Sequence, residues 1–391
     1  MTDRVLLIIV SCLMTIGIIA SYSLSTYIIR MDNMMEFKFL LVQLLASFTA
    51  LVVMWKISLL DPDVWIPRIG FSLFGGSLVL IIAMPFLPSS IVPTINGAKR
   101  WIQIGISISP VELFKIGFIY FLAWSFSRKF YLQKAHDWRE EIKVFIPYAV
   151  VFIVAIFMIV ILQNDLGQGM VLGSALLVML LFAGGSLMLF GSLLGFGFLL
   201  VTAFIISSSY RLGKVKVWWA GVQDSILSFL PSGMADFLRV DAVGADQAYQ
   251  VSQAANAIAH GGWFGTGIGG GILKLGFVSD VHTDFVMAGI IEETGIIGAL
   301  LVTSLIISMI FWLLRIANRS ENPVYYLFCI GIAVMFTSQF AMNALGIVGL
   351  APVKGITLPF VSYGGSSIIA LSIAVGMVMA ISKRANLKNL P

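Results

Sequence analysis

Apolar runs long enough to cross a lipid bilayer recur along the whole chain, from Val5 to Ser382. A transmembrane helix needs about 20 such residues, because the hydrocarbon core of a bilayer is about 30 Å thick. Only 11% of the residues are charged, whereas a soluble globular chain carries about 25%. The chain is therefore expected to be an integral membrane protein, and a soluble enzyme with a membrane tail is excluded.

The apolar runs predict an all-α membrane protein with about ten transmembrane helices, built as one domain of residues 1–391. The first run is too long for a signal-peptide core and lacks a convincing cleavage site, so we expect it to remain as the first span. The expected helices cover residues 5–29, 38–55, 68–88, 110–127, 144–163, 169–186, 188–209, 284–314, 323–348 and 365–383.

Basic residues gather after the fourth, eighth and tenth expected helices. Cytoplasmic loops carry an excess of Lys and Arg, so we expect these three segments and both termini in the cytoplasm. The residues are Arg128, Lys129, Lys134, Arg139, Lys143, Arg315, Arg319, Lys383, Arg384 and Lys388. The connections expected outside include residues 89–109, 164–168, 210–283 and 349–364.

The connection of residues 210–283 is far longer than usual, and loops of this size are either functional or disordered. Its apolar segments, 217–220 and 226–230, favour short helices at the membrane interface. Residues 265–270 fit the pattern G-x-G-x-x-G, but a dinucleotide site needs a preceding strand and a βαβ unit. Tight turns or close backbone approach, to a helix or to a ligand, explain these glycines better.

Charges near expected helix ends are candidate binding groups, because a charge within a bilayer usually faces a cavity or a partner. Glu112 and Lys115 are neighbours at i,i+3. Either they pair with each other, or Lys115 holds an anionic head group. Lys99 and Arg100 are suited to phosphate. Lys354 is the only charge in an apolar segment broken by Pro and Gly, and such backbone at membrane depth lines a cavity.

Two carboxylates and a histidine, in Asp280-Val-His282-Thr-Asp284, stand at the expected outer mouth of the eighth helix. Asp284 is placed either to act as a general base or to cap the helix, and spacing alone does not decide between them. These residues and His260 match no dedicated metal site. We therefore expect no metal held tightly by the protein.

Four blocks of sequence, in this order, carry a family resemblance. They are Gly97–Ile102 with Ser109–Lys115, Gln247–Gly271, His282–Phe285 with Glu292–Gly295, and Leu358–Ser367. Together they resemble the SEDS family (shape, elongation, division and sporulation), whose members include FtsW, RodA and SpoVE. The resemblance covers nearly the whole chain. It implies a peptidoglycan glycosyltransferase that polymerises lipid II, an undecaprenyl-diphosphate-linked disaccharide peptide, at the outer face of the bacterial inner membrane.

By this resemblance, Asp284 falls on the family's essential aspartate. It would take the proton from the acceptor hydroxyl that attacks the donor's anomeric carbon, with undecaprenyl diphosphate leaving. Lys115 and Arg100 are suited to neutralising the diphosphate. A Mg²⁺ or Mn²⁺ ion held loosely on the diphosphate fits this chemistry, with no tightly bound cofactor. The other expected substrate-binding residues are Lys354, Glu112, Lys99, His260, His282 and Ser362.

The resemblance further implies a class B penicillin-binding protein and other cell-division proteins as partners at the septum. Residues 354–359 and 252–260 look closer to the division member, FtsW, than to the elongation member, RodA. The net charge of +5 is explained by basic residues that flank membrane spans. We therefore expect no nucleic-acid partner.

Three alternatives stay open: an elongation polymerase like RodA, a lipid II flippase or other transporter, and a noncatalytic scaffold. A transporter should show repeated halves and polar sites at the midplane, whereas the motifs here gather at one face. A scaffold predicts that the substitution Asp284→Asn leaves growth intact.

Overall fold

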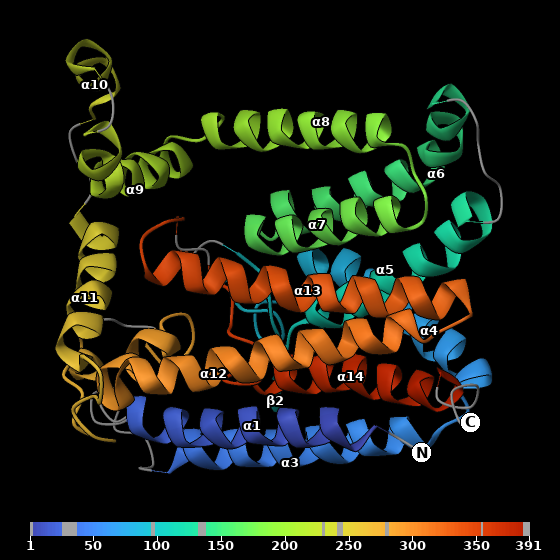
Figure 1. Cartoon of the computed structure of the whole chain (residues 1–391), viewed down its shortest axis with the longest axis horizontal. Helices are drawn as coiled ribbons and strands as arrows, with labels where there is room; N and C mark the ends of the chain where they lie inside the picture. The colour runs from blue at the N-terminus through green and yellow to red at the C-terminus, as the bar shows by residue number, and fades with distance from the viewer. Residues whose placement is uncertain are drawn as a thin grey trace.

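In a computed structural model, the protein is a bundle of long helices that run along one common direction (Figure 1). The structure describes residues 3–25, 37–94, 98–131, 138–228, 231–240, 245–277, 281–352 and 355–385. The two ends of the chain lie at the same end of the bundle in Figure 1. The short helices of the long connection lie at the opposite end.

Each of the ten expected spans coincides with a helix. The helices are α1 (Arg4–Leu24), α3 (Lys38–Leu59), α4 (Pro62–Ala83), α5 (Pro110–Phe126), α6 (Trp138–Ile156), α7 (Leu166–Phe182), α8 (Leu187–Ile206), α12 (Val286–Asn318), α13 (Pro323–Ile347) and α14 (Gly365–Ala385). In the described part of the chain, 8 helices are long and apolar enough to cross a membrane. Helices α5 and α7, with 17 residues each, are shorter.

The remaining elements either extend these helices, as η1 and η3 do, or lie in the connections. They are η1 (Met84–Phe86), β1 (Ile102–Ile104), β2 (Ile106–Ile108), the π-helical turns η2 (Ser127–Tyr131) and η3 (Phe157–Leu162), α9 (Ser209–Leu227), α10 (Ser232–Leu238), α11 (Ala245–Gly261) and η4 (Leu273–Leu275). The short helices expected within residues 210–283 are thus present as α9, α10 and α11. Residues 229 and 230, the end of one predicted segment, lie outside the described residues.

A small antiparallel hairpin of β1 and β2 departs from a purely helical fold, with Ile102 opposite Ile108. Residues 101–108 alternate isoleucine with other residues, and this period of two fits a strand and does not fit a helix. The hairpin precedes α5 directly, so it lies beside the helix that carries Glu112 and Lys115.

Burial separates the central helices from those that face lipid. Nearly every residue of α5 is buried, whereas in α8 a single residue, Leu189, is buried. A helix that is apolar all round lies in a protein core or in a membrane. The exposed apolar surface of α8 is therefore suited to lipid, while α5 lies at the centre of the bundle.

Polar contacts close the end of the bundle where the chain begins and ends. The Asp61 side chain accepts a hydrogen bond from Asp63 N at the start of α4. Arg384, in the last turn of α14, forms ion pairs with both carboxylates, at 3.5 Å and 2.8 Å. The Tyr325 hydroxyl of α13 donates to Asp63. These contacts join α4, α13 and α14 at the end opposite the long connection.

Candidate active site

Asp284 lies in the turn before α12, level with the last turns of α13. Its backbone carbonyl accepts a hydrogen bond from the Asn343 side-chain amide at 2.9 Å. The same amide nitrogen donates to Ile356 O at 2.8 Å. The N-cap position of α12 falls on Phe285, the residue after Asp284. Asn343 therefore holds the backbone of Asp284 against the segment that precedes α14.

Residues 355–358, which we call the strap, cover one side of the Asp284 carboxylate. Gly355 has a φ of 64°, and a Cβ built there would stand 3.2 Å from Asp284 Oδ2. Glycine suits both this left-handed backbone and this close approach. The adjoining cavity, which Asn343 and Met342 also line, measures about 10 Å³, room for about one water molecule.

Ser362 and His282 hold the strap and the Asp284 turn together. The buried Ser362 hydroxyl donates to Thr283 O at 2.6 Å and accepts from Leu358 N at 2.8 Å. Tyr363 N donates to the backbone carbonyl of His282 at 3.0 Å. The His282 ring packs 5.2 Å from the ring of Phe39. Both predicted residues therefore lie beside Asp284, and the described contacts of the Ser362 hydroxyl are to backbone.

Glu112 and Lys115 form an i,i+3 ion pair, one of the two alternatives that the sequence left open, with 3.0 Å between Nζ and Oε2 and side chains 8% and 0% exposed. Gln168 Nε2 donates to Glu112 Oε1 at 3.0 Å, and the Ser367 hydroxyl donates to Oε2 at 3.4 Å. Among the described residues, the Lys115 ammonium has no partner in hydrogen-bond geometry. A buried cation with incomplete partners has capacity to bind an anion.

One short run of sequence joins the two groups of residues. Ser362 contacts Thr283 beside Asp284, and Ser367, in the first turn of α14, contacts Glu112. The run of residues 362–367 therefore links the Asp284 turn to the Glu112–Lys115 pair. Its Gly-Gly-Ser-Ser segment, Gly364–Ser367, begins α14 between the two groups.

Arg100, just before the hairpin, contacts the segment between η3 and α7. Its guanidinium donates to Gln163 O at 2.9 Å and Asn164 O at 2.8 Å, and lies 3.9 Å from the Asp165 carboxylate. Asp165 is the N-cap of α7. Burial raises the pKa of the Asp165 carboxyl, and the nearby Arg100 charge opposes that shift. Arg100 thus holds the end of η3 and the start of α7 in place.

Two other predicted binding residues, Lys99 and His260, make their described contacts elsewhere. Lys99 donates to the carbonyls of Pro85 and Leu87, at 3.2 Å and 3.1 Å, so its described contacts are at the end of α4. His260 pairs with Glu292 at 3.3 Å and is not joined to Asp284 by any described contact. Lys354 lies outside the described residues.

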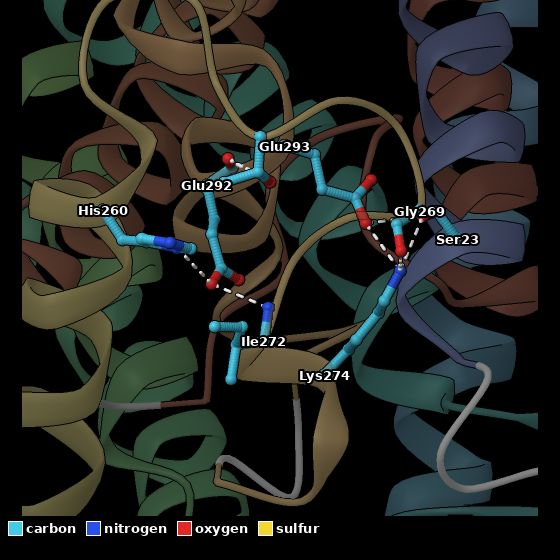
Figure 2. A network of polar contacts seen from close by, with 8 residues as sticks. Ser23, His260, Gly269, Ile272, Lys274, Glu292 and Glu293 are labelled. Carbon is cyan, nitrogen blue, oxygen red and sulfur yellow. Dashed lines mark hydrogen bonds and ion pairs between the residues drawn. The ribbon is translucent and has the colours of Figure 1, made fainter.

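A second polar cluster includes His260, and Figure 2 shows its members. Glu292 accepts from His260 and, at 2.8 Å, from Ile272 N. Glu293 pairs with Lys274 at 3.0 Å and accepts from Ser23 of α1 at 2.6 Å. Lys274 also donates to Gly269 O at 2.6 Å. Both carboxylates therefore hold the glycine-rich segment, residues 261–277, against α12 and α1. We call this segment the glycine loop.

The glycine loop is inserted into a break in α12. Gly295 has a φ of 73° inside the helix, and a Cβ there would stand 2.2 Å from Trp263 O. Helix hydrogen bonds are replaced by bonds to the loop: Thr266 N to Glu292 O, Gly267 N to Glu293 O and Ile296 N to Gly262 O, each 2.9 Å, and Ile297 N to Trp263 O, 3.4 Å. The glycines therefore let the backbone of the loop approach a neighbouring helix closely, which is one of the roles that the sequence predicts for them.

Two residues of the site were absent from the sequence prediction. Asn343 bonds to Asp284 O and Gln168 bonds to Glu112, and each stands in a predominantly apolar helix. A polar residue inside a membrane helix was the available signal, because such residues are costly and usually functional. In the described part of the chain, no group of three or more His, Cys, Asp or Glu could hold a metal ion.

Comparison with known sequences and structures gives consistent matches. The sequence model of the FtsW/RodA/SpoVE family, described as "Cell cycle protein", matches residues 3–387. A "Probable peptidoglycan glycosyltransferase FtsW" from Helicobacter pylori is 43% identical over 384 residues, 98% of each chain. A protein of the same description from Trichlorobacter lovleyi is 31% identical over 394 residues, 100% of this chain and 94% of the relative.

Two solved structures share the fold. One, from work titled "Structural coordination of polymerization and crosslinking by a peptidoglycan synthase complex", has a TM-score of 0.73 at 22% identity and covers 99% of both chains. The other, the rod shape determining protein RodA of Thermus thermophilus, has a TM-score of 0.66 at 22% identity. It covers 99% of this chain and 98% of that one.

Proposed function

The chain belongs to the FtsW/RodA/SpoVE family of cell cycle proteins, and from that premise we propose that it is a peptidoglycan glycosyltransferase. Its substrate is lipid II, which it polymerises into glycan strands. The observation that carries this proposal is the joining of Asp284 to the buried Glu112–Lys115 pair through residues 362–367. We infer that Asp284 acts as a carboxylate base and Lys115 as a buried cation in one site.

The chemistry needs one proton acceptor and one anion-binding group. The acceptor's sugar hydroxyl attacks the anomeric carbon of the donor, a carbon–oxygen bond forms, and the bond to undecaprenyl diphosphate breaks. Asp284 takes the hydroxyl proton as general base. The Lys115 ammonium offsets the charge that develops on the leaving diphosphate, an effect that is strong where water is excluded. Arg100 supports this region by holding the junction of η3 and α7.

The experiment that tests this function separates polymerisation from transport. The purified protein is reconstituted in liposomes with labelled lipid II, with and without a class B penicillin-binding protein, and both strand length and lipid II translocation are measured. We expect strands. Translocation without strands under every partner condition would identify a transporter instead.

A divalent cation enters this proposal as a companion of the substrate. The described residues offer no group of three or more metal-binding side chains. We propose that a Mg²⁺ or Mn²⁺ ion is carried by the diphosphate oxygens, because such hard cations prefer oxygen ligands. In the liposome assay, titration with each ion tests this requirement separately from the assignment of Asp284.

We place the Asp284 end of the bundle at the outer face of the cytoplasmic membrane. Arg315 and Arg384 lie at the other end, where the chain begins and ends, and basic residues favour the cytoplasmic side. The chain is a bacterial membrane protein, and the relatives named FtsW support a role at the division septum. A fluorescent fusion that labels the lateral wall and not the septum would favour elongation.

Asn343 gives a prediction about the position of the general base. The substitution Asn343→Ala removes two hydrogen bonds that hold Asp284 and the strap, each contributing about 0.5–1.5 kcal/mol. A shift of about 1 Å in a catalytic group lowers the rate by about 100-fold, so we expect kcat to fall by about 10- to 100-fold with a smaller change in KM. Steady-state polymerisation kinetics measure both constants.

The control for Asn343 comes from the same helix. Ser338 bonds to Ser174 of α7 at 2.7 Å, so Ser338→Ala also removes a side-chain hydrogen bond from α13. We expect Ser338→Ala to keep the wild-type kcat. Equal losses in both variants would mean that Asn343 only supports the packing of α13.

For the cross-linking partner, an apolar groove between α12 and α13 offers a docking surface for a transmembrane helix. The groove has a volume of about 500 Å³, and its lining includes Ile307, Phe340, Ala341 and Ala344. Small residues let helices approach closely in a membrane. Ile307 is 56% exposed, so the groove opens toward lipid. We propose that a transmembrane helix of a class B penicillin-binding protein occupies it.

Filling the groove tests this partner surface. We expect Ala341→Leu with Ala344→Leu to lower co-purification with the partner by about tenfold, because the larger side chains keep the helices apart. Leu199→Phe, on the lipid-facing surface of α8, is the matched control. Unchanged co-purification of the double variant would place the partner on another surface.

A further inference from the structure

The glycine loop turns an apolar surface outward. Between residues 261 and 273 the sequence has no Asp, Glu, Lys or Arg, and the one charge that follows, Lys274, is buried and paired with Glu293. Large exposed apolar patches usually mark an interaction site. The exposed side chains are Trp263 (66%), Phe264 (83%), Ile268 (65%), Ile272 (46%), Leu275 (51%) and Phe277 (41%).

The polar atoms of the loop turn the other way. Part of its backbone bonds to the peptide groups of α12 that have no partner within the helix at the break. Two further backbone groups of the loop, Ile272 N and Gly269 O, bond to the side chains of Glu292 and Lys274 (Figure 2). Irregular backbone is tolerated at membrane depth only where the protein satisfies its hydrogen bonds. On its inner side the loop makes these hydrogen bonds to the protein, and on its outer side it presents large apolar side chains.

The depth of the loop follows from its attachment to α12. Trp263 O accepts from Ile297 N, so Trp263 is level with Ile297. From Ile297 to Arg315, α12 runs for about 27 Å at about 1.5 Å per residue. That length is close to the hydrocarbon thickness of about 30 Å. With Arg315 at one membrane boundary, Trp263 lies at the other, the level that tryptophan prefers.

The apolar surface of the loop is continuous with the lipid-facing surface of α12. Ile297, Leu300 and Leu301 of α12 are 50%, 59% and 54% exposed, and Ile297 is bonded directly to the loop. We propose that the glycine loop is seated in the outer leaflet, with Trp263, Phe264 and Ile268 among the lipids. The partner of this surface is the bilayer itself. The assignment to the outer leaflet rests on the orientation proposed above, whereas the seating of the loop in lipid uses neither Asp284 nor the substrate.

A labelled cysteine at position 264 tests the inference. In a chain whose Cys12 and Cys329 are replaced by Ser and Ala, Phe264→Cys is labelled with an NBD fluorophore and reconstituted in phosphatidylcholine liposomes. The lipids carry a doxyl quencher at carbon 5 of the acyl chain. We expect quenching of about twofold or more, because the probe sits at the boundary of the outer leaflet.

Two matched positions calibrate the experiment. Leu199→Cys, on the exposed surface of α8, should be quenched. Gly233→Cys, on α10 and with open space around its Cβ, should not be quenched. Each variant must elute as a monodisperse species. A Phe264→Cys signal as unquenched as that of Gly233→Cys would overturn the inference. The inference would also be overturned if the probe left the aqueous phase only after a penicillin-binding protein was added, because the surface would then bind that protein and not lipid.

Discussion

Replacing Asp284 by Asn is expected to lower the rate of glycan-strand formation by about 100- to 10,000-fold, the range that general-base catalysis contributes. Asn has nearly the same shape but cannot take the hydroxyl proton at neutral pH. The backbone of Asp284, held by Asn343, keeps its hydrogen bond in this variant. The loss should therefore fall on kcat and leave the binding of lipid II largely intact.

The measurement pairs polymerisation of labelled lipid II with thermal unfolding of the same sample. Asp284→Glu is the informative companion, because it keeps the carboxylate but moves it by about one methylene group. We expect Asp284→Glu to retain more activity than Asp284→Asn. If a well-folded Asp284→Asn protein forms strands at the wild-type rate, Asp284 is not the base, and the noncatalytic scaffold becomes the better account of the chain.

Replacing Lys115 by Met is expected to destabilise the protein and to lower its activity together. Lys115 and Glu112 are both buried, and removal of one partner leaves a buried charge uncompensated, at a cost of about 3–5 kcal/mol. Loss of activity in Lys115→Met alone therefore does not distinguish a structural role from binding of the diphosphate.

The double substitution Glu112→Gln with Lys115→Met separates the two roles. Neutral replacement of a buried ion pair is often tolerated, and the amide oxygen introduced by Glu112→Gln can still accept a hydrogen bond from Gln168 or Ser367. We expect thermal stability to return to the wild-type range while polymerisation stays reduced by about tenfold or more. Recovery of both stability and activity would assign the ion pair a structural role only.

The fold was largely predictable because bilayer thickness fixes the length of each span. Each expected span coincides with a helix, even α5, which carries a buried ion pair. The all-α prediction did not include the hairpin of residues 102–108, although the alternation of its isoleucines is typical of a strand. A segment so rich in isoleucine indicates both an apolar membrane segment and a strand, and only tertiary packing selects between them.

The site was predictable where local spacing defines it. Glu112 and Lys115 meet because i,i+3 residues are neighbours on any helix. In contrast, Asn343 and Gln168 are marked in the sequence only as polar residues in membrane helices, and their partners depend on how α13 and α7 pack. His260 was grouped with Asp284 by residue type, but its partner in the structure is Glu292. The pairing brings together α11 and α12 next to the break at Gly295, where the glycine loop bonds to α12. The sequence did not predict this break, because residues 284–314 read as one long apolar helix.

The account is tested most directly by counting products in one reaction. Purified wild type and Asp284→Asn are incubated with labelled lipid II, and bound lipid II, glycosidic bonds and released undecaprenyl diphosphate are quantified in the same samples. For wild type, the account predicts one diphosphate released for each bond formed. For the variant it predicts bound lipid II with neither product. Bond formation by the folded variant at the wild-type rate, or no bond formation by the folded wild type with any partner, would contradict it.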